Sequence, residues 1–501
     1  MRTLAPPAPP EAAPADAPAH PSSRRGGGRR RPPSTATLLG AVLALIVWVL
    51  ELRPLIDNSF LIHLQTGRWI LDHHAIPGHD LFSFTAPGTP WVVQSWLASV
   101  LYAGIDRLVG PFGLQILRAA TCALVTFLVF RLAHRLAGDR TRATLLAFAA
   151  TAMSITVWSE RPLLQGVLAM VVLIWVVEVP DSVAGRHPLA VVPPVMWLWA
   201  NLHGTFALGF AYLALHLCGR WLDGVAPWED RRERTLLAAT GLALAVCLVN
   251  PLGLKLLTFP VELLSRGDTL AHIKEWRSPD FHSFMGMLFA LWIVTYAIGL
   301  SRGRDRWSRR DLLVSVVFLL LALWALRNLV VAPLVGLPVV ARALAVPERR
   351  PDRRPPLNWA VLALLGVVGV MALFQAAGAE HYDFSTYPVK AMQAVEDHGL
   401  IGRHLLTTDA WAAYVIHTYG QRQPVFIDDR YDMYPTAVSN DYFSLRKGEA
   451  DWSGILDRRG VDVIVWDRQN PLASLLDLDS AGWTRIYVDD QAAVWVRRPV
   501  A

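Results

Sequence analysis

Cysteine and charged residues are both scarce in this chain. It has 501 residues but only three cysteines, and only 18% of its residues are charged. Cys122, Cys218 and Cys247 all lie in apolar segments, which excludes disulfides and cysteine-ligated zinc from the hydrophilic region after residue 380. Soluble domains carry about 25% charged residues, so the shortfall indicates a polytopic membrane protein.

The sequence also contains no nucleotide-binding glycine loop and no internal repeat. Its formal charge of +6 comes from basic residues that gather in clusters between apolar stretches. Such clusters are typical of the loops beside membrane spans, so the chain is expected to contact a lipid bilayer and no nucleic acid.

Residues 1–33 are rich in Pro, Ala, Gly and Arg and have almost no large apolar side chains. A segment of this composition cannot bury a core, and we expect residues 1–35 to form a disordered cytoplasmic tail. Its arginines directly precede the apolar run 38–52. Because no convincing cleavage site follows, this run is interpreted as an uncleaved first span.

Eleven apolar stretches are long enough, or nearly so, to cross a bilayer, which takes about 20 residues. They fall near residues 36–52, 112–133, 143–159, 163–179, 188–202, 205–222, 236–250, 284–300, 312–326, 329–346 and 357–377.

The basic clusters predict the topology of these stretches. Cytoplasmic loops carry an excess of Arg and Lys, so an even number of spans should separate each pair of clusters. The clusters lie at 24–31, 131–142, 231–234, 302–310 and 349–354. This rule makes 91–110 an amphipathic helix on the outer surface, and it places Arg327 and Asn328 at the outer tip of a hairpin.

The resulting fold class is an α-helical polytopic membrane protein of about 11 spans with a C-terminal extracytoplasmic α/β domain. The spans occupy residues 36–379, with a first outer loop at 53–111, and the last domain occupies 380–501. The N-terminus is expected in the cytoplasm.

The polar motifs that are not simple charge clusters all fall at the outer ends of the predicted spans. They include Asp57, His63, Arg68, Arg161, Asn201, His203, Asn250, Lys255, Glu275, Trp276 and Arg327. The inner loops hold little besides arginines, so the outer face is predicted to carry the chemistry.

The stretch "DNSFLIHLQTGRWILDHHAIPGHDLFSFTAPGTPWVVQSWLA", residues 57–98, resembles the first outer loop of bacterial GT-C-type glycosyltransferases. These membrane enzymes are related to protein O-mannosyltransferases, aminoarabinose transferases and the catalytic subunit of oligosaccharyltransferase. The motifs "SERPLL", "NLHGTF", "NPLGLKLL", "EWRSPDF" and "RNL" are similar to later blocks of a poorly characterised branch of that superfamily.

The resemblance implies an inverting glycosyltransferase of the bacterial plasma membrane. Such an enzyme moves a sugar from a polyprenyl-phosphate donor to a glycan, lipid or protein acceptor outside the cell, and Asp57 matches the catalytic acidic position. The chain departs from the pattern in two places. It has no Asp-x-Asp pair in the second outer loop, where only Glu160 is available, and it has Ser95 where a Glu often precedes Trp96. A divalent ion, Mg²⁺ or Mn²⁺, is left open as a cofactor, with Glu160 as the candidate ligand.

The residue types suit this chemistry. A phosphate leaves as a stable anion and needs positive charge rather than a proton, so one carboxylate acting as general base on the acceptor hydroxyl is sufficient. Asp57 is the candidate base. Arg161, Lys255 and Arg327 are candidates for binding the donor phosphate, and the candidates for other substrate contacts are His63, Arg68, Trp96, His203 and Glu275.

Structural roles can also explain these residues. Asp57 is suited to capping a helix that starts at Asn58, and this role is compatible with catalysis. Arg161 and Arg327 can extend to lipid headgroups at span ends, and His203 can be a packing residue beside Gly204.

After residue 380, short strand-like patterns alternate with helical ones, which predicts a small α/β domain. "HLLTTD", "PVFIDD", "VDVIVWD", "TRIYVD" and "AAVWVRR" are expected strands, with helices at "WAAYVIHTYG" and "YPTAVSNDYFSLRKG". Asp428, Asp429, Arg430 and Asp432 follow the second of these strands. They form either an acceptor or metal site beyond a strand end or a solvated turn with internal ion pairs.

Two other functions compete with the transferase. A transporter or flippase would place ionisable groups at mid-span and contain inverted repeats, whereas the polar motifs here collect at one face. A non-catalytic scaffold for envelope glycan assembly is also consistent with the missing acidic pair.

Overall fold

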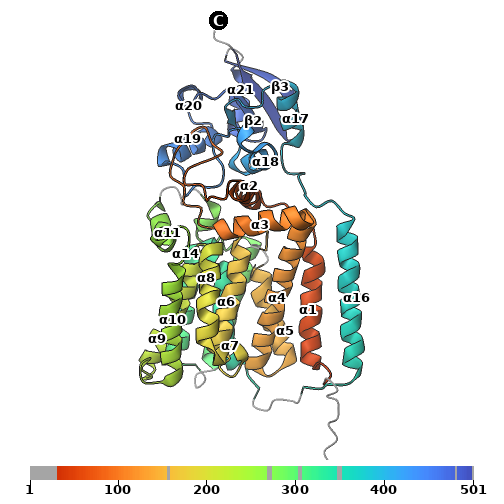
Figure 1. Cartoon of the computed structure of the whole chain (residues 1–501), viewed down its shortest axis with the longest axis vertical. Coiled ribbons are helices and arrows are strands. Elements are labelled where there is room, and N and C mark those ends of the chain that lie inside the picture. The colour runs from red at the N-terminus through yellow and green to blue at the C-terminus, as the bar shows by residue number, and fades with distance from the viewer. Residues whose placement is uncertain are drawn as a thin grey trace, which may run out of the picture.

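The computed structural model describes residues 31–154, 158–267, 273–302, 307–346, 352–479 and 482–498. The described chain forms a tall helical bundle with a smaller α/β domain on one end (Figure 1). Most of the predicted tail, residues 1–30, lies outside the described residues. Parts of two predicted basic clusters, 303–306 and 349–351, lie outside them as well.

Each of the eleven predicted apolar stretches overlaps one helix of the bundle. These are α1 (Thr35–Glu51), α4 (Pro111–Ala137), α5 (Arg140–Ser154), α6 (Leu163–Glu178), α8 (Pro188–Leu202), α9 (Phe206–Leu222), α10 (Arg231–Cys247), α13 (Phe284–Arg302), α14 (Arg309–Trp324), α15 (Val331–Ala343) and α16 (Leu357–Ala377). The helix begins inside the predicted tail, because the Ser34 side chain caps α1.

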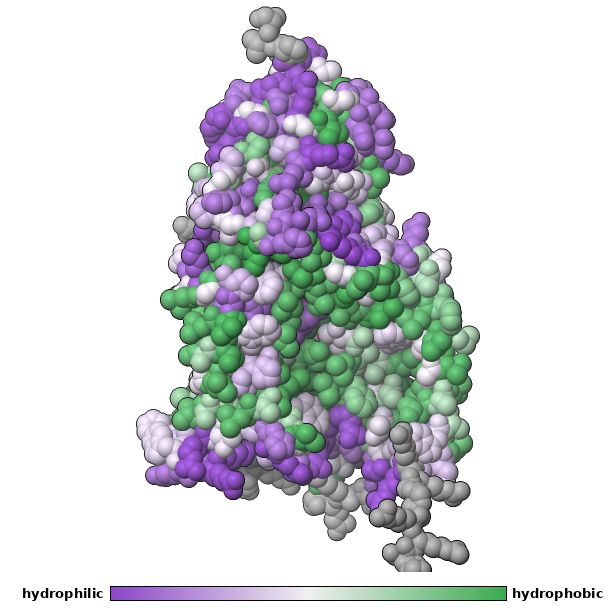
Figure 2. Space-filling view, in the orientation of Figure 1, coloured by the Kyte–Doolittle hydropathy of each residue, from purple (hydrophilic) through white to green (hydrophobic). Residues whose placement is uncertain are grey.

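Four helical segments of the described chain are long and apolar enough to cross a membrane: α4, α13, α16 and residues 326–343. Helices α1, α6, α8 and α9 are apolar but shorter. Figure 2 shows a hydrophobic band across the visible face of the bundle, between hydrophilic ends. The chain is therefore a membrane protein, and the number of eleven crossings stays a prediction.

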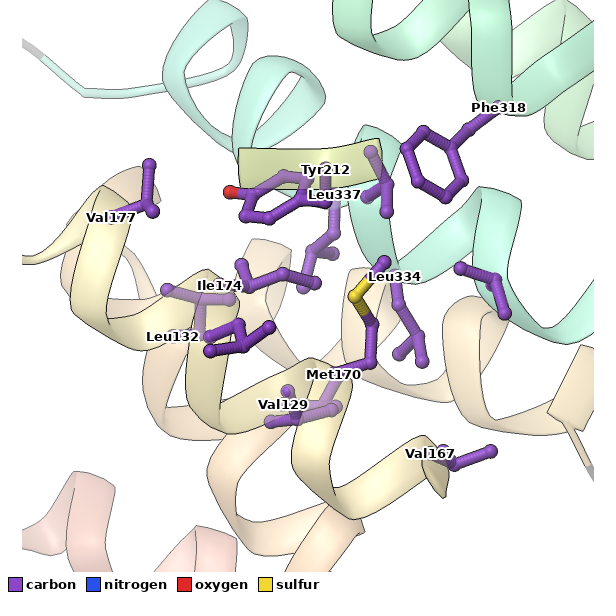
Figure 3. Close-up of a cluster of buried hydrophobic side chains, with 14 of the residues drawn as sticks. Val129, Leu132, Val167, Met170, Ile174, Val177, Tyr212, Phe318, Leu334 and Leu337 are labelled. Atoms are coloured by element: carbon purple, nitrogen blue, oxygen red, sulfur yellow. The ribbon is translucent and has the colours of Figure 1, made fainter. Parts of the chain in front are cut away.

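The bundle core joins helices that are distant in sequence. Figure 3 shows Val129 and Leu132 from α4 and Met170 and Ile174 from α6, with Tyr212, Phe318, Leu334 and Leu337 from α9, α14 and α15 around them. Leu337 and Met170 are fully buried. Tight packing of this kind fixes the positions of the helix ends that carry the polar motifs.

A buried ionic network lies at the end of the bundle opposite the α/β domain. Glu178 at the end of α6 accepts from Arg310 at 2.5 Å and from Arg342 at 2.6 Å. Arg310 Nε also donates to His216 Nδ1 at 2.9 Å, and His216 contacts Glu233 at 3.0 Å. The expectation that this end holds little besides arginine tethers was wrong, because these arginines are paired inside the bundle.

Two helices lie across the end of the bundle next to the α/β domain, and one of them, α3, corresponds to the predicted surface helix 91–110. Helix α3 (Trp96–Val109) lies across the bundle end, and α2 (Asn58–His73) lies between α3 and the α/β domain (Figure 1). Residues 91–95 of the predicted 91–110 helix are not helical. Gly67 lets α2 approach α3, because a Cβ there would collide with the carbonyl oxygen of Ser99.

Short elements complete this end of the bundle. They are α11 (Leu254–Leu264), η2 (Lys274–Trp276) and η3 (Leu326–Val330), with α7 (Val183–Arg186) at the opposite end. Arg327 and Asn328 lie in η3, which joins α14 to α15, and Asn328 Nδ2 donates to the Leu321 carbonyl at 2.9 Å. That this connection faces outside stays a prediction.

The strands of the α/β domain are β1 (Leu405–Leu406), β2 (Val463–Asp467), β3 (Trp483–Val488) and β4 (Ala492–Arg497). They form one sheet with the order β1-β2-β4-β3. Strands β1 and β2 are parallel, whereas β4 is antiparallel to both β2 and β3. The surrounding helices are α17 (Val389–Asp397), α18 (Asp409–Tyr419), η4 (Gly420–Arg422), α19 (Thr436–Lys447), α20 (Trp452–Arg458) and α21 (Pro471–Leu478).

The predicted strand "PVFIDD" was wrong as a regular strand. Its Val425 forms only isolated bridges, one to Leu405 of β1 and one to Ser83 of the first outer loop. The segment instead joins the loop to the sheet edge, so the α/β domain and the bundle share backbone pairing.

A buried arginine in α4 holds the chain just before α2. Arg118 is ion-paired with Glu160 and lies 3.3 Å from Glu51, and its side chain is 1% exposed. It also donates to backbone carbonyls of Glu51 and Pro54. This arginine therefore sets the path that leads to Asp57.

We predict that Arg118→Met destabilises the protein by about 3–5 kcal/mol, because removing one partner leaves buried carboxylates uncompensated. Thermal unfolding of the purified protein in detergent measures the effect. Arg107→Met is the control, because the Arg107–Asp72 pair is exposed and should contribute less than about 1 kcal/mol. Equal shifts for the two variants would contradict this account.

The topology can be tested with reporter fusions after residues 136, 303 and 380. Charge asymmetry predicts that the first two positions report from the cytoplasm and the third from outside the cell. A cytoplasmic signal after residue 380 would overturn the layout.

Candidate functional site

Asp57 lies where the bundle meets the α/β domain. It is the N-cap of α2, as predicted, because Oδ1 accepts from the Phe60 backbone N–H at 3.1 Å. Its side chain is 9% exposed. A carboxylate has about four acceptor positions, so capping leaves Asp57 able to interact with further groups.

Arg161 connects Asp57 to a third segment. Its Nε donates to Asp57 Oδ2 at 2.7 Å, and its Nη1 donates to Glu275 in η2. Burial opposes the charged guanidinium, but Asp57 and Glu275 outweigh it and raise the pKa of Arg161. Asp57 and Glu275, which are far apart in sequence, therefore both contact the predicted site residue Arg161.

Asp429 brings the α/β domain to the same place. The Asn58 amide donates to its Oδ2 at 2.8 Å, and the Ser59 hydroxyl donates to the same oxygen. Arg161 Nη2 reaches Asn58 Oδ1 at 3.4 Å. Burial, with the nearby charge of Asp428, raises the pKa of Asp429 to about 7.

His63 and His203 lie near these charges as neutral side chains. His63 Nδ1 lies 3.1 Å from Ser99 Oγ, and burial with repulsion from Arg161 lowers the pKa of His63 to about 4. His203 Nδ1 lies 2.8 Å from Thr205 Oγ1, and burial with repulsion from Arg327 lowers its pKa. Both rings can donate or accept one hydrogen bond without adding charge.

Arg327 supplies a second cation to this region. Its guanidinium lies 4.6 Å from the centre of the Trp276 ring and interacts electrostatically with Glu275 and Arg161. The Leu326 N–H donates to the Arg277 carbonyl at 2.8 Å, which joins the η2 and η3 segments. We call the set Asp57, His63, Arg161, His203, Glu275, Arg327 and Asp429 the junction cluster.

Other predicted site residues have separate partners. Arg68 pairs with Asp106 at 2.8 Å, and the Trp96 indole donates to Asn201 at 2.8 Å. Lys255 is exposed on the first turn of α11.

Glu160, the candidate metal ligand, faces Arg118 in the buried pair described above. The described residues include no group of three His, Cys, Asp or Glu side chains that could hold a metal ion. Asp57 and Glu275 both face the Arg161 guanidinium, which would repel a divalent cation at this place. Because this donor set does not fit a metal, we assign no step to one.

Two acids of the "IDDRYDMYP" segment have different partners: Asp429 contacts α2, as described above, and Asp428 contacts Arg430. Asp428 binds Arg430 through both oxygens, and Arg430 Nη2 also reaches Asp80 of the first outer loop at 2.7 Å. The Arg430 guanidinium lies 4.3 Å from the centre of the Trp91 ring. The internal ion pair is confirmed, but the expectation of a solvated turn was wrong, because Asp428 and Arg430 are buried between the loop and the α/β domain.

Sequence reasoning missed the connection between Asp429 and α2, together with Asn58 and Ser59 as its partners. Ser59 and Asp429 are 370 positions apart, and neither lies in a recognisable motif with the other. In the sequence, Asp429 is marked only by its position after the apolar run "PVFI". That position does not indicate which residue it contacts.

The raised pKa of Asp429 predicts a pH-dependent stability. An unfolded aspartate has a pKa of about 4, so the folded chain holds this proton more tightly. The contribution of protonated Asp429 to the free energy of unfolding is therefore full below about pH 4, and it is lost as the pH rises through 7. Asp429→Asn removes the titration, and the melting temperature of the variant relative to the unaltered protein should rise between pH 5 and pH 8. A constant difference over this range would contradict the assignment.

No family model and no curated protein matches the chain. Solved structures do resemble it. The oligosaccharyltransferase of Archaeoglobus fulgidus tethered with an acceptor peptide gives a TM-score of 0.53 at 11% identity, covering 92% of this chain and 74% of that one. The apo form of that enzyme gives a TM-score of 0.51 at 11% identity, with coverages of 86% and 69%.

A mycobacterial arabinofuranosyltransferase, AftD, gives a TM-score of 0.47 at 16% identity, covering 92% of this chain and 41% of that one. At these identities the likeness concerns the fold alone. The chain therefore shares its fold with the archaeal oligosaccharyltransferase.

Proposed function

We propose that this protein transfers a sugar from a polyprenyl-phosphate donor to an acceptor outside the bacterial plasma membrane, with inversion at the anomeric carbon. The acceptor is a cell-envelope glycan, a lipid or a protein. The observation that carries the proposal is the direct contact of Asp57 with Arg161 at the junction of the apolar bundle and the α/β domain. A lipid-linked donor and a polar acceptor approach such a junction from different sides.

Asp57 is the general base in this proposal. The acceptor oxygen attacks the anomeric carbon while the bond from that carbon to the phosphate oxygen breaks. The hydroxyl proton passes to Asp57, and the phosphate leaves with the bonding electron pair. The cap to Phe60 and the contact with Arg161 hold the carboxylate in one orientation, which lowers the entropy that the reaction must lose.

Arg161 and Arg327 stabilise the phosphate that leaves. A guanidinium can donate to two phosphate oxygens at once, and Arg161 is 29% exposed, so part of it can reach a ligand. Arg327 is held by Trp276 on the neighbouring element. Lys255 is a further candidate for phosphate contact, from the exposed turn of α11. His63, His203 and Glu275 are placed to contact the sugar or acceptor, and Arg68 and Trp96 support α2 and α3 beneath them.

We predict that Asp57→Asn lowers sugar transfer by roughly 10²–10⁴-fold, which is the usual contribution of a general base. Asparagine is also a good N-cap, so α2 and membrane insertion should be retained. Transfer is measured by comparing envelope glycans and lipid-linked sugars in cells that carry each variant.

Asp72→Asn is the matched control, because Asp72 lies on the same helix in an exposed pair with Arg107. It should transfer sugar at the normal rate. Full transfer by Asp57→Asn would reject Asp57 as the base.

A further inference from the structure

A groove of about 780 Å³ lies beside the segment that joins the bundle to the α/β domain. It is lined by residues of the link between α16 and α17 and by the turn between β3 and β4: Glu380, His381, Tyr382, Asp383, Phe384, Ser385, Tyr387, Val389, Lys390, Asp489, Asp490 and Gln491. We call it the linker groove. Its size is that of a typical ligand site, and no residue of the junction cluster lines it.

The wall of the groove is paired directly with the segment that leads to Asp57. The Leu55 N–H donates to the His381 carbonyl at 2.8 Å, and the Asp383 N–H donates to the Leu55 carbonyl at 2.9 Å. Leu55 and Tyr382 form a parallel bridge. A ligand in the groove would therefore contact the segment 381–383, which is paired with Leu55, two residues before Asp57.

Tyr387 links the groove to the junction cluster. It lines the groove, and its hydroxyl donates to the Ile56 carbonyl at 2.8 Å. Burial first, and then the charges of Asp57 and Asp429, raise the pKa of Tyr387. One tyrosine side chain thus connects the lining of the groove to the residue before Asp57.

The lining determines the class of ligand. Tyr382 and Phe384 lie half-buried with their rings stacked, 5.1 Å apart and 9° from parallel. Aromatic faces of this kind are apolar surfaces that can receive the flat face of a sugar ring. Around them are four carboxylates and a single ammonium, that of Lys390. Sugar hydroxyls donate to carboxylates in charge-assisted hydrogen bonds.

The same charges exclude the donor from the groove. A polyprenyl-phosphate sugar is anionic, and the excess of carboxylates would repel it. Most residues of the groove lining are also polar or charged, and they include Ser385 and Gln491. A neutral, polyhydroxylated ligand from the aqueous side fits both observations.

We infer that the linker groove binds the acceptor as a neutral glycan chain and directs its end toward Asp57. This inference rests on the proposed function and narrows the acceptor from three classes to one.

The test uses the full-length protein in detergent micelles with neutral linear hexasaccharides of glucose, mannose and arabinose as probes. Ser385 is exposed in the lining, so Ser385→Trp fills the groove without disturbing buried contacts. Ser453→Trp makes the same change on exposed α20, outside the groove. Asp490→Asn removes one lining carboxylate at an exposed turn and is a second variant that does not depend on a bulky residue.

We expect at least one hexasaccharide to bind, with affinity at least tenfold lower in Ser385→Trp, reduced in Asp490→Asn and unchanged in Ser453→Trp. In transfer assays, Ser385→Trp should raise the acceptor KM at least tenfold while the donor KM and kcat stay the same. Binding is measured without donor, so it does not depend on catalysis.

Absence of binding by all three sugars, or equal binding by Ser385→Trp, would overturn the inference. Binding of a lysine-rich peptide in preference to the sugars would also overturn it, in favour of a protein acceptor. If transfer is observed but its acceptor KM is insensitive to Ser385→Trp, the groove assignment fails and the proposed function stands. If the sugars bind in the groove but Asp57→Asn has no effect on transfer, the proposed base fails instead.

Discussion

The ion pair between Arg161 and Asp57 is the interaction on which the outer end of this protein depends. A charge at the end of an apolar bundle is costly unless it is paired, and Arg161 obtains two carboxylate partners from different segments. The pair fixes the start of α2, the loop before α6 and the η2 element relative to one another. The same groups that hold this end together are therefore the groups that chemistry would use.

The two ends of the bundle carry similar ion pairs whose acidic partners differ in exposure. At the end far from the α/β domain, Glu178 is 5% exposed and pairs with Arg310 and Arg342, which are 7% and 27% exposed. In the junction cluster, Asp57 is 9%, Arg161 29% and Glu275 47% exposed. The main difference is therefore Glu275, which is open to solvent, whereas Glu178 is enclosed by the helices around it.

The α/β domain is part of the outer site rather than an appendage to it. Arg430 ties it to the first outer loop through Asp80, and Val425 pairs with Ser83 of the same loop. Asp429 contacts the first residues of α2. The lining of the linker groove contacts Leu55 and Ile56, so the proposed acceptor surface is joined directly to the segment that carries the proposed base.

The sequence by itself determined the features that depend on local pattern. The length of the apolar runs located the eleven bundle helices. The charge clusters predicted the short connection at Arg327, and the chemistry of Asp57 predicted its role as an N-cap. It also identified Asp57, Arg161 and Glu275 as outer polar residues, but as members of three unrelated motifs.

Only the tertiary structure decided which of these residues meet. Arg161 is 104 positions from Asp57 and 114 from Glu275, and Asp429 is 370 from Ser59. It also decided that Glu160 faces Arg118, that Lys255 stays exposed and that "PVFIDD" bridges two segments instead of forming a strand. The physical reason is that capping and helix formation depend on neighbours along the chain. The pairing of buried charges depends instead on the path that the packed helices impose on distant segments.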